Sequence, residues 1–264
     1  MKDVLITGGA SGMGRATALK LAQNGYRVFS CDINEAENIP GVVQLKVDVR
    51  DTKSIENALQ KVREYTDKLD AVISFAGIIM MNSLIEIEEE EFIKIFDINL
   101  FGVYRINKIF FPLVQKGQGK VIITTSELAE NKVLPFNAIY AITKKALDAY
   151  AQGLTMELGL LGIPVVTLRP GAVKTPILDD SNKEMNKMNE KTVLYSEMIN
   201  NFKHIVDKEQ GGSVPPEEIA DLVLQILSKK NTKLVYTKNV SAKLKMLNLV
   251  PGKMQIKILK SMLK

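Results

Sequence analysis

The stretch DVLITGGASGMG, residues 3–14, places a short apolar run directly before a turn with four glycines. The apolar run predicts a β-strand over 3–7, and the pattern from Arg15 to about Asn24, closed by Gly25, predicts a helix. Glycines in such a turn let the backbone approach a diphosphate, which then lies at the positive end of the helix. The stretch therefore predicts a dinucleotide-binding α/β fold. A turn that only packs tightly is the alternative.

Strand-like runs and helical patterns alternate along the rest of the chain. Helices are expected from Asp51 or Thr52 to about residue 68, over 95–115 with Pro112 kinking or shortening it, over 137–161 and over 215–229. This alternation predicts an α/β fold with one Rossmann-type doubly wound parallel sheet of about seven strands, flanked by helices. The further strands are expected at residues 27–31, 42–47, 70–74, 120–125, 164–168 and 234–236.

The sequence divides into a single domain, residues 1–240, and a basic amphipathic C-terminal extension, residues 241–264. The domain includes an insert at 176–214, which is long for a structureless loop and is expected to contain short helices that close over a substrate. The extension carries six lysines and no acid, whereas the whole chain has a net charge of +5, so the domain itself sums to −1. This distribution argues against a nucleic-acid partner.

Two interpretations of the extension stay open. Leu, Met and Ile recur at helical spacing over 241–249 and 253–263, with lysines between them and Pro251-Gly252 as a break. Such helices can rest on an anionic membrane surface. Alternatively, the extension is a lid or a subunit contact whose apolar face is buried and whose lysines are solvated.

Composition excludes several kinds of chemistry and location. With 46% hydrophobic and 25% charged residues, the chain is typical of a globular protein. Cys31 and His204 are its only cysteine and histidine, so we expect no disulfide, no Ser-His-Asp triad and no metal site. The first strand begins directly after residue 2 and no apolar run reaches the length of a membrane span. We expect a cytoplasmic location, with peripheral membrane contact through residues 241–264 as the alternative.

Asp32 stands at the end of the second expected strand. An acid there can accept hydrogen bonds from both ribose hydroxyls of an adenosine and repel a 2′-phosphate. The neighbouring positions Ser11 and Ile33 hold no Lys or Arg that would pair with such a phosphate. The pattern favours NAD over NADP, with a turn cap as the alternative role for Asp32.

Tyr140 and Lys144 lie one turn apart on the same face of the helix expected over 137–161. A tyrosine ordinarily titrates near 10, and a cation held beside it lowers its pKa, which makes the side chain usable as an acid or a base. Tyr and Lys are common on helices, so an exposed pair without chemistry is the alternative. The glycine turn and Asp32 upstream favour the catalytic interpretation.

Together these motifs make the chain resemble the short-chain dehydrogenase/reductase family over residues 3 to about 236. Thr7-Gly8-x-x-x-Gly12-x-Gly14 matches the cofactor turn, Asp48-Val49 the adenine contact, and Pro170-Gly171 through Thr175 the nicotinamide-side loop. Asn99, Ser126, Tyr140 and Lys144 match the catalytic tetrad. The cofactor-binding residues that the resemblance implies are Gly8, Ser11, Gly12, Met13, Gly14, Asp32, Ile33, Asp48, Val49, Ala76, Gly77, Tyr140, Lys144, Pro170, Gly171, Val173 and Thr175.

The resemblance also implies a role for each catalytic residue. Tyr140 exchanges the proton of the substrate oxygen, Lys144 lowers the pKa of Tyr140 and binds the nicotinamide ribose, Ser126 holds the substrate oxygen, and Asn99 anchors a water that links Lys144 to solvent. Two features depart from the family. The run Ser74–Gly77 reads Ser-Phe-Ala-Gly where Asn-Asn-Ala-Gly is usual, and Ser126 lies one residue farther from Tyr140 than is common.

The segments expected around the substrate are apolar and rich in Met, which suits a small lipophilic alcohol or ketone such as a hydroxysteroid or a retinoid. We expect an NAD(H)-dependent oxidoreductase, most simply a homodimer or homotetramer. Ordinary core packing is the alternative for the apolar residues. The alternative functions are an idle NAD(H) sensor or scaffold, or a reductase of a lipid-chain ketone at a membrane surface. The expected substrate-pocket residues are Glu127, Leu128, Leu134, Phe136, Ile177 and Leu178.

Overall fold

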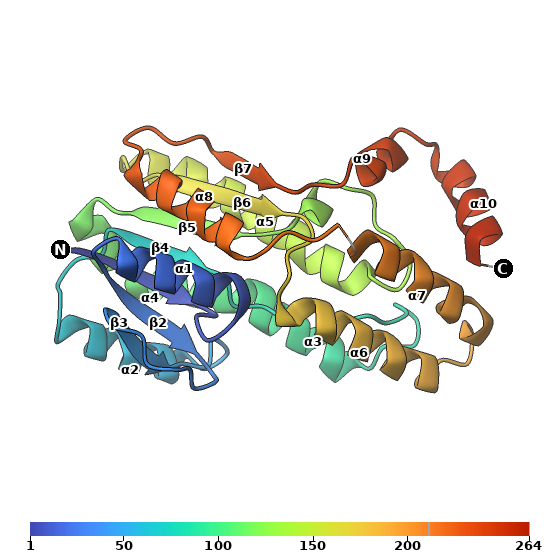
Figure 1. The fold of residues 1–264 in the computed structure, drawn as a ribbon, viewed down its shortest axis with the longest axis horizontal. Helices are drawn as coiled ribbons and strands as arrows, with labels where there is room; N and C mark the ends of the chain where they lie inside the picture. Colours follow the sequence, from blue (N-terminus) through green and yellow to red (C-terminus); the bar gives the residue numbers. More distant parts are fainter. Residues whose placement is uncertain (211, 264) are drawn as a thin grey trace.

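A seven-stranded parallel sheet forms the centre of the computed structural model, which describes residues 1–210 and 212–263 (Figure 1). Its strand order is β3-β2-β1-β4-β5-β6-β7, so the chain leaves β1 in one direction and returns to its other side with β4. The prediction of a Rossmann-type doubly wound sheet is confirmed. The strands are β1 (Lys2–Thr7), β2 (Tyr26–Asp32), β3 (Val42–Lys46), β4 (Ala71–Ser74), β5 (Lys120–Thr124), β6 (Val165–Pro170) and β7 (Val235–Lys238).

Helices cover both faces of the sheet (Figure 1). Between α3 and α4 the chain forms one π-helical turn, Asp97–Phe101, and a 3₁₀ turn, Glu127–Ala129, follows β5. The helices are α1 (Gly12–Gln23), α2 (Thr52–Arg63), α3 (Glu89–Phe96), α4 (Gly102–Gly117), α5 (Ala138–Gly159), α6 (Pro176–Lys191), α7 (Ser196–Gln210), α8 (Glu217–Ser228), α9 (Ala242–Asn248) and α10 (Gly252–Leu263).

The apolar runs of the central strands are buried on both sides, as a covered parallel sheet requires. Leu5 packs in the core formed with α2, α4 and α5, whereas its neighbours Val4 and Ile6 pack in the core formed with α1 and α8. All three side chains are fully buried. The alternation of side chains along β1 therefore fills both layers and fixes the glycine turn that follows at the carboxyl edge of the sheet.

Several predicted boundaries are wrong. The helix expected to reach residue 68 ends at Arg63. The helix expected over 95–115 belongs to a longer helical stretch that starts at Glu89 and runs through the π-helical turn to Gly117. Pro112 does not end it, because the ring lies on the exposed side, where the freed carbonyl group can face water. The insert forms two full helices, α6 and α7, rather than short ones.

The C-terminal extension forms two helices, α9 and α10, near the predicted positions. Leu263 of α10 is buried in an apolar cluster with Met185 of α6 and Phe202 of α7. The side-chain amide of Asn201 also donates to the backbone oxygen of Leu263 at 3.3 Å. The extension is thus packed on the insert at the end of the molecule farthest from the N-terminus (Figure 1). None of the helices in the described part of the chain has the length and apolar character needed to cross a bilayer.

Candidate active site

The glycine turn after β1 is a tight cradle. Gly8 has φ +71°, and a Cβ atom there would lie 2.7 Å from the backbone nitrogen of Ala76. Only glycine fits a left-handed backbone at that distance from a neighbouring strand. The Thr7 hydroxyl accepts a hydrogen bond from the same Ala76 nitrogen at 3.3 Å, so the turn and the end of β4 are held together. The crevice where the strand order reverses, between β1 and β4, opens above them.

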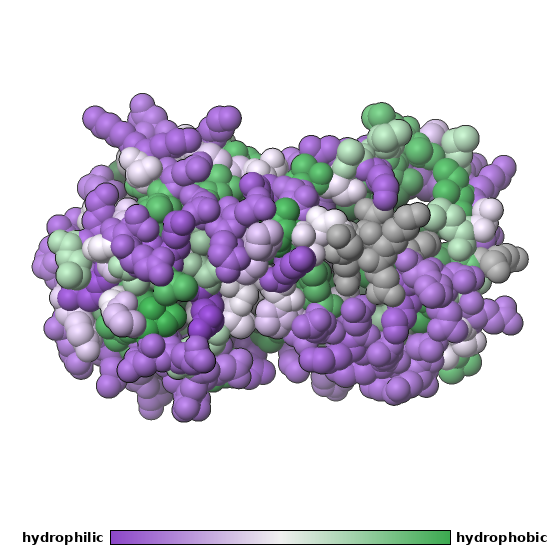
Figure 2. Space-filling view, in the orientation of Figure 1, coloured by the Kyte–Doolittle hydropathy of each residue, from purple (hydrophilic) through white to green (hydrophobic). Residues whose placement is uncertain are grey.

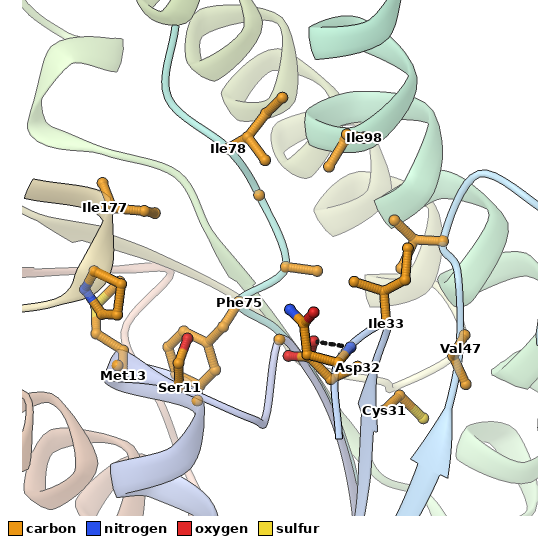
Figure 3. A pocket seen from close by; sticks show the side chains of 18 of the residues that line it. Ser11, Met13, Cys31, Asp32, Ile33, Val47, Phe75, Ile78, Ile98 and Ile177 are labelled. Carbon is orange, nitrogen blue, oxygen red and sulfur yellow. Dashed lines mark hydrogen bonds between the residues drawn. The ribbon is translucent and has the colours of Figure 1, made fainter. Parts of the chain in front are cut away.

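A pocket of about 430 Å³ fills this crevice (Figure 3). Figure 3 shows Ser11 and Met13 on one side of it and Asp32 and Ile33 on another. Of the residues expected to bind cofactor, the pocket is lined by Gly8, Ser11, Gly12, Met13, Gly14, Asp32, Ile33, Asp48, Val49, Ala76, Gly77 and Thr175. The volume, the glycine cradle and the acid at the end of β2 all fit a dinucleotide.

Asp32 is oriented by two backbone groups. Its carboxylate accepts hydrogen bonds from the backbone nitrogen of Ala10 at 3.0 Å and of Asn34 at 2.9 Å. The turn-cap role and the cofactor role are thus compatible, because a carboxylate has further acceptor positions.

Arg50 is a lining residue that the sequence interpretation missed. Its guanidinium donates to the Asp48 carboxylate at 2.6 Å, and this hydrogen bond lowers the pKa of Asp48. No spacing rule pointed to Arg50, which directly follows the expected adenine contact Asp48-Val49. Two further basic side chains lie near this pocket: Arg15, which is paired with Glu37, and Lys94, which lines the pocket.

A second pocket, of about 390 Å³, joins the first. Met13, Phe75, Gly77, Thr175 and Ile177 line both. Phe75, which replaces a family asparagine, therefore faces the junction between them. Ser126, Tyr140 and Lys144 form a polar group in the wall of the second pocket, where Pro170, Gly171 and Val173 of the expected nicotinamide-side loop also lie.

Lys144 is buried and Tyr140 is half-buried, and removal from water changes the acidity of both side chains. The Lys144 ammonium nitrogen lies 5.7 Å from the Tyr140 ring centroid and donates to the Thr124 backbone oxygen at 3.3 Å. Burial raises the pKa of Tyr140 to about 12, although a hydrogen bond with Ser126 opposes the rise. Burial lowers the pKa of Lys144 to about 8. The expected lowering of the Tyr140 pKa is wrong here, because removal from water disfavours the phenolate more than its neighbours stabilise it.

Asn99 lies in the π-helical turn behind the pocket wall. Its carbonyl oxygen accepts from the Ile78 backbone nitrogen at 2.8 Å, and its amide donates to the Ile78 oxygen at 2.9 Å and to the Thr143 hydroxyl at 3.1 Å. Asn99 thus connects the segment after Gly77 to helix α5. Both ends of the side chain are bonded to protein, and the expected role of Asn99 as a water anchor stays a prediction.

The apolar part of the second pocket is only partly as expected. Glu127, Leu128, Leu134, Ile177 and Leu178 line it. Phe136, which was expected to line the pocket, does not line it. Its ring packs in a core cluster against Tyr195 and Phe202. Phe202 of the insert lines the pocket as the insert was expected to, and the main omission is the C-terminal extension. The pocket is also lined by Phe202, Val206, Asn239, Val240, Ser241 and Leu244.

The fold, the glycine cradle and the joined pocket with its Ser, Tyr and Lys side chains define a dinucleotide-dependent oxidoreductase. Residues 2–186 match the sequence profile of the short chain dehydrogenase family, and the chain belongs to that family.

The chain is similar in sequence to two named reductases and in structure to one solved alcohol dehydrogenase. The chain is 28% identical over 229 residues, 86% of it and 84% of the relative, to the 3-ketodihydrosphingosine reductase of Bacteroides thetaiotaomicron. It is 33% identical over 198 residues, 73% of it and 66% of the relative, to the NADPH-dependent 1-acyldihydroxyacetone phosphate reductase of Schizosaccharomyces pombe. The alcohol dehydrogenase of Thermococcus sibiricus, solved with 5-hydroxy-NADP, superposes with a TM-score of 0.71 at 26% identity, covering 90% of this chain and 96% of that one.

Proposed function

We propose that the protein is an NADH-dependent reductase of a ketone carried on a lipid chain. The observation that carries the proposal is the second pocket, whose polar group of Ser126, Tyr140 and Lys144 faces a wall of aliphatic and aromatic side chains from α6, α7 and α9. Such a pocket can hold a carbonyl group at one end and bury a hydrocarbon chain along the rest.

The names of two relatives support a lipid ketone over a steroid or a retinoid. One is a reductase of 3-ketodihydrosphingosine and the other of 1-acyldihydroxyacetone phosphate, and both names describe a ketone next to a long apolar chain. Among the substrate classes that the sequence suggested, the lipid-chain ketone is therefore the one we propose. Its reduction product is the corresponding secondary alcohol.

In the proposed mechanism the protein positions the carbonyl group and supplies the proton. A bound nicotinamide cofactor supplies the hydride. Ser126 holds the carbonyl oxygen through its hydroxyl, and Tyr140 donates its phenolic proton to that oxygen. Because the pKa of Tyr140 is raised to about 12, the side chain is protonated at neutral pH, which is the form that reduction requires.

Lys144 and Asn99 have supporting roles in this proposal. When Tyr140 has donated its proton it is a phenolate. The Lys144 ammonium stabilises that negative charge, since its nitrogen lies 5.7 Å from the centre of the Tyr140 ring. Asn99 is a positioning residue: through Ile78 it holds the segment after β4 that carries Gly77 between the two pockets. We further propose NAD rather than NADP as the cofactor, because Asp32 lines the first pocket where a 2′-phosphate would be repelled.

The test compares ketones while NADH absorbance is followed. We expect turnover of 3-ketodihydrosphingosine or 1-acyldihydroxyacetone phosphate in detergent micelles. Within a ketone series, each methylene that becomes buried should raise kcat/KM about fourfold, since it contributes about 0.8 kcal/mol. Turnover of a ketosteroid, retinal or short ketone with no rise along the chain-length series would overturn the lipid assignment.

We also infer that the protein forms a homo-oligomer through the face of α4 and α5. This face carries the exposed side chains Phe101, Tyr104 and Met156 and a cavity of about 260 Å³ lined by residues of both helices. Exposed aromatic side chains beside a cavity are typical of subunit contacts. Light scattering of the purified protein tests this: a monomer, or an oligomer insensitive to Tyr104→Glu, contradicts it.

A further inference from the structure

The chain between β7 and α9 is fixed to the candidate active site at several points. The Asn239 side-chain amide donates to the backbone oxygens of Ala172 and Gly212, both at 2.8 Å. The Glu127 carboxylate, directly after Ser126 in the chain, accepts from the Ser241 backbone nitrogen at 2.5 Å. Val240, Ser241 and Leu244 consequently form part of the substrate-pocket wall.

The other end of α9 is held by the segment that follows Glu127. The Asn248 side chain accepts from the Lys132 backbone nitrogen at 2.8 Å and donates to the Asn131 side-chain oxygen at 2.9 Å. The Lys132 ammonium donates to the Val250 backbone oxygen at 2.6 Å. Helix α9 is thus a rigid wall of the pocket rather than a free tail.

In both extension helices some apolar side chains pack against the protein and others are exposed to solvent. Helix α10 turns Gln255, Leu259 and Leu263 toward the protein, with spacings of four residues. A second row with the same spacing, Met254, Ile258 and Met262, is exposed. This second apolar row faces outward along the whole helix.

Helix α9 repeats this arrangement on a smaller scale. Leu244 lines the pocket, whereas Met246 and Leu249 point outward, with 68% and 84% of their surface exposed. The turn between α6 and α7 adds the exposed Val193 and Leu194 at the same end of the molecule (Figure 1). Figure 2 shows hydrophobic residues gathered over α9 and α10. Exposed apolar side chains gathered over two neighbouring helices are typical of an interaction surface.

Lysines accompany the exposed apolar residues. Lys245, Lys253, Lys257 and Lys260 are exposed on the two helices, and residues 241–264 contain no acid; Lys264 lies outside the described residues. Apolar side chains interleaved with lysines and free of carboxylates complement a surface that is both negatively charged and hydrocarbon-bearing. An anionic lipid bilayer has both properties.

We propose that α9 and α10 dock on an anionic phospholipid bilayer, with Met246, Leu249, Met254, Ile258 and Met262 inserted among the headgroups. Helix α9 then contacts the bilayer with one face and forms the substrate-pocket wall with the other. A lipid ketone can pass from the membrane along α9 to Tyr140 without exposure to water. The docking stands on the surface itself, whereas the delivery of substrate rests on the proposed function.

Vesicle flotation tests the docking without substrate. We expect the full-length protein to float with phosphatidylcholine vesicles that contain phosphatidylserine, and to float weakly with phosphatidylcholine alone. Each lysine near an anionic surface contributes about fivefold to binding, so Lys253→Gln/Lys257→Gln/Lys260→Gln should bind on the order of 100-fold more weakly. Lys46→Gln/Lys53→Gln/Lys61→Gln removes the same charge from exposed positions far along the chain and should bind as wild type.

A second variant isolates the apolar contribution. Met254→Ser/Ile258→Ser/Met262→Ser changes only the exposed row of α10 and should lose vesicle binding while its circular dichroism and its turnover of a ketone in detergent micelles stay as in wild type. Flotation that is absent, or equal for both triple lysine variants, overturns the docking. So does a loss of oligomers in the Met254→Ser/Ile258→Ser/Met262→Ser variant with unchanged flotation, because the surface would then be a contact between copies.

The two proposals fail separately in these experiments. Turnover of keto lipid in micelles without vesicle binding refutes the docking and leaves the proposed function standing. Vesicle binding without turnover of any keto lipid refutes the proposed substrate and leaves the docking standing. If both hold, turnover of a lipid ketone embedded in anionic vesicles should fall in the Lys253→Gln/Lys257→Gln/Lys260→Gln variant, whereas turnover in micelles should not.

Discussion

Arg169 and Asp148 form a two-point ion pair beneath the candidate active site. The guanidinium donates from Nε to Oδ1 and from Nη2 to Oδ2, both at 2.8 Å, and both side chains are buried. Asp148 lies one helical turn beyond Lys144, and its Oδ1 also accepts from the hydroxyl of Thr125, the neighbour of Ser126, at 3.3 Å. One carboxylate therefore connects α5 to the carboxyl ends of β5 and β6.

Replacing Asp148 with Asn should destabilise the protein severely. The change leaves the buried Arg169 guanidinium with only Glu130, a half-exposed carboxylate, as its anion. Loss of one partner of a buried pair costs about 3–5 kcal/mol. Urea unfolding followed by circular dichroism measures this free energy. The double variant Asp148→Leu/Arg169→Met is the control, since it removes both charges and should be more stable than Asp148→Asn. A loss below about 1 kcal/mol in Asp148→Asn would show that the pair does not hold these elements together.

Tyr140→Phe should abolish turnover and leave NADH affinity largely intact. The variant lacks the proton donor, and general acid catalysis contributes about 10²–10⁴-fold in rate. Steady-state kinetics and fluorescence titration with NADH measure the two effects separately. Tyr150→Phe is a matched control on the same helix, because its hydroxyl bonds with Asn107 and lies outside the two joined pockets. Retained activity in Tyr140→Phe refutes its role in proton transfer.

The sheet was predictable because its signal is local. Val4, Leu5 and Ile6 form an apolar run that only a strand covered on both faces accommodates, and the glycines after it require a turn whatever packs around them. The positions of the candidate catalytic residues Ser126, Tyr140 and Lys144 followed from the family resemblance, and the structure brings the three to one pocket. Their pKa values did not follow from it, because the rise at Tyr140 comes from burial by residues far away in the chain.

The C-terminal extension shows what the sequence pattern could not predict. Its amphipathic pattern predicted two helices, yet the pattern does not say which surface an apolar face will contact. That Leu244 lines the second pocket depends on Glu127 and Asn131 holding α9 from a distant segment. Phe136 is a similar case: its backbone has φ +64°, and its ring packs against Phe202 instead of lining the pocket.

Lys144 should make stability depend on pH. Burial lowers its pKa to about 8 from 10.5, so between these values the unfolded chain binds one proton more than the folded chain. The free energy of unfolding should then rise with pH across this window, by about 1.4 kcal/mol per pH unit from this group. Lys144→Met removes the contribution and should be more stable than wild type at pH 7. The exposed Lys53→Met is the control and should keep the wild-type slope; an unchanged slope in Lys144→Met contradicts the burial of a charged lysine.

Asp32→Ala should shift cofactor use toward NADPH. The wild-type carboxylate, oriented by the backbone nitrogens of Ala10 and Asn34, repels a 2′-phosphate and accepts hydrogen bonds from a ribose. Its removal should lower the ratio of kcat/KM for NADH to that for NADPH about tenfold or more, which corresponds to about 1.4 kcal/mol. Glu35→Ala removes an equal charge from a nearby exposed position and should leave the ratio unchanged, since long-range attraction is screened by salt. A wild-type enzyme that already prefers NADPH, or equal shifts in both variants, would mean that Asp32 does not select the cofactor.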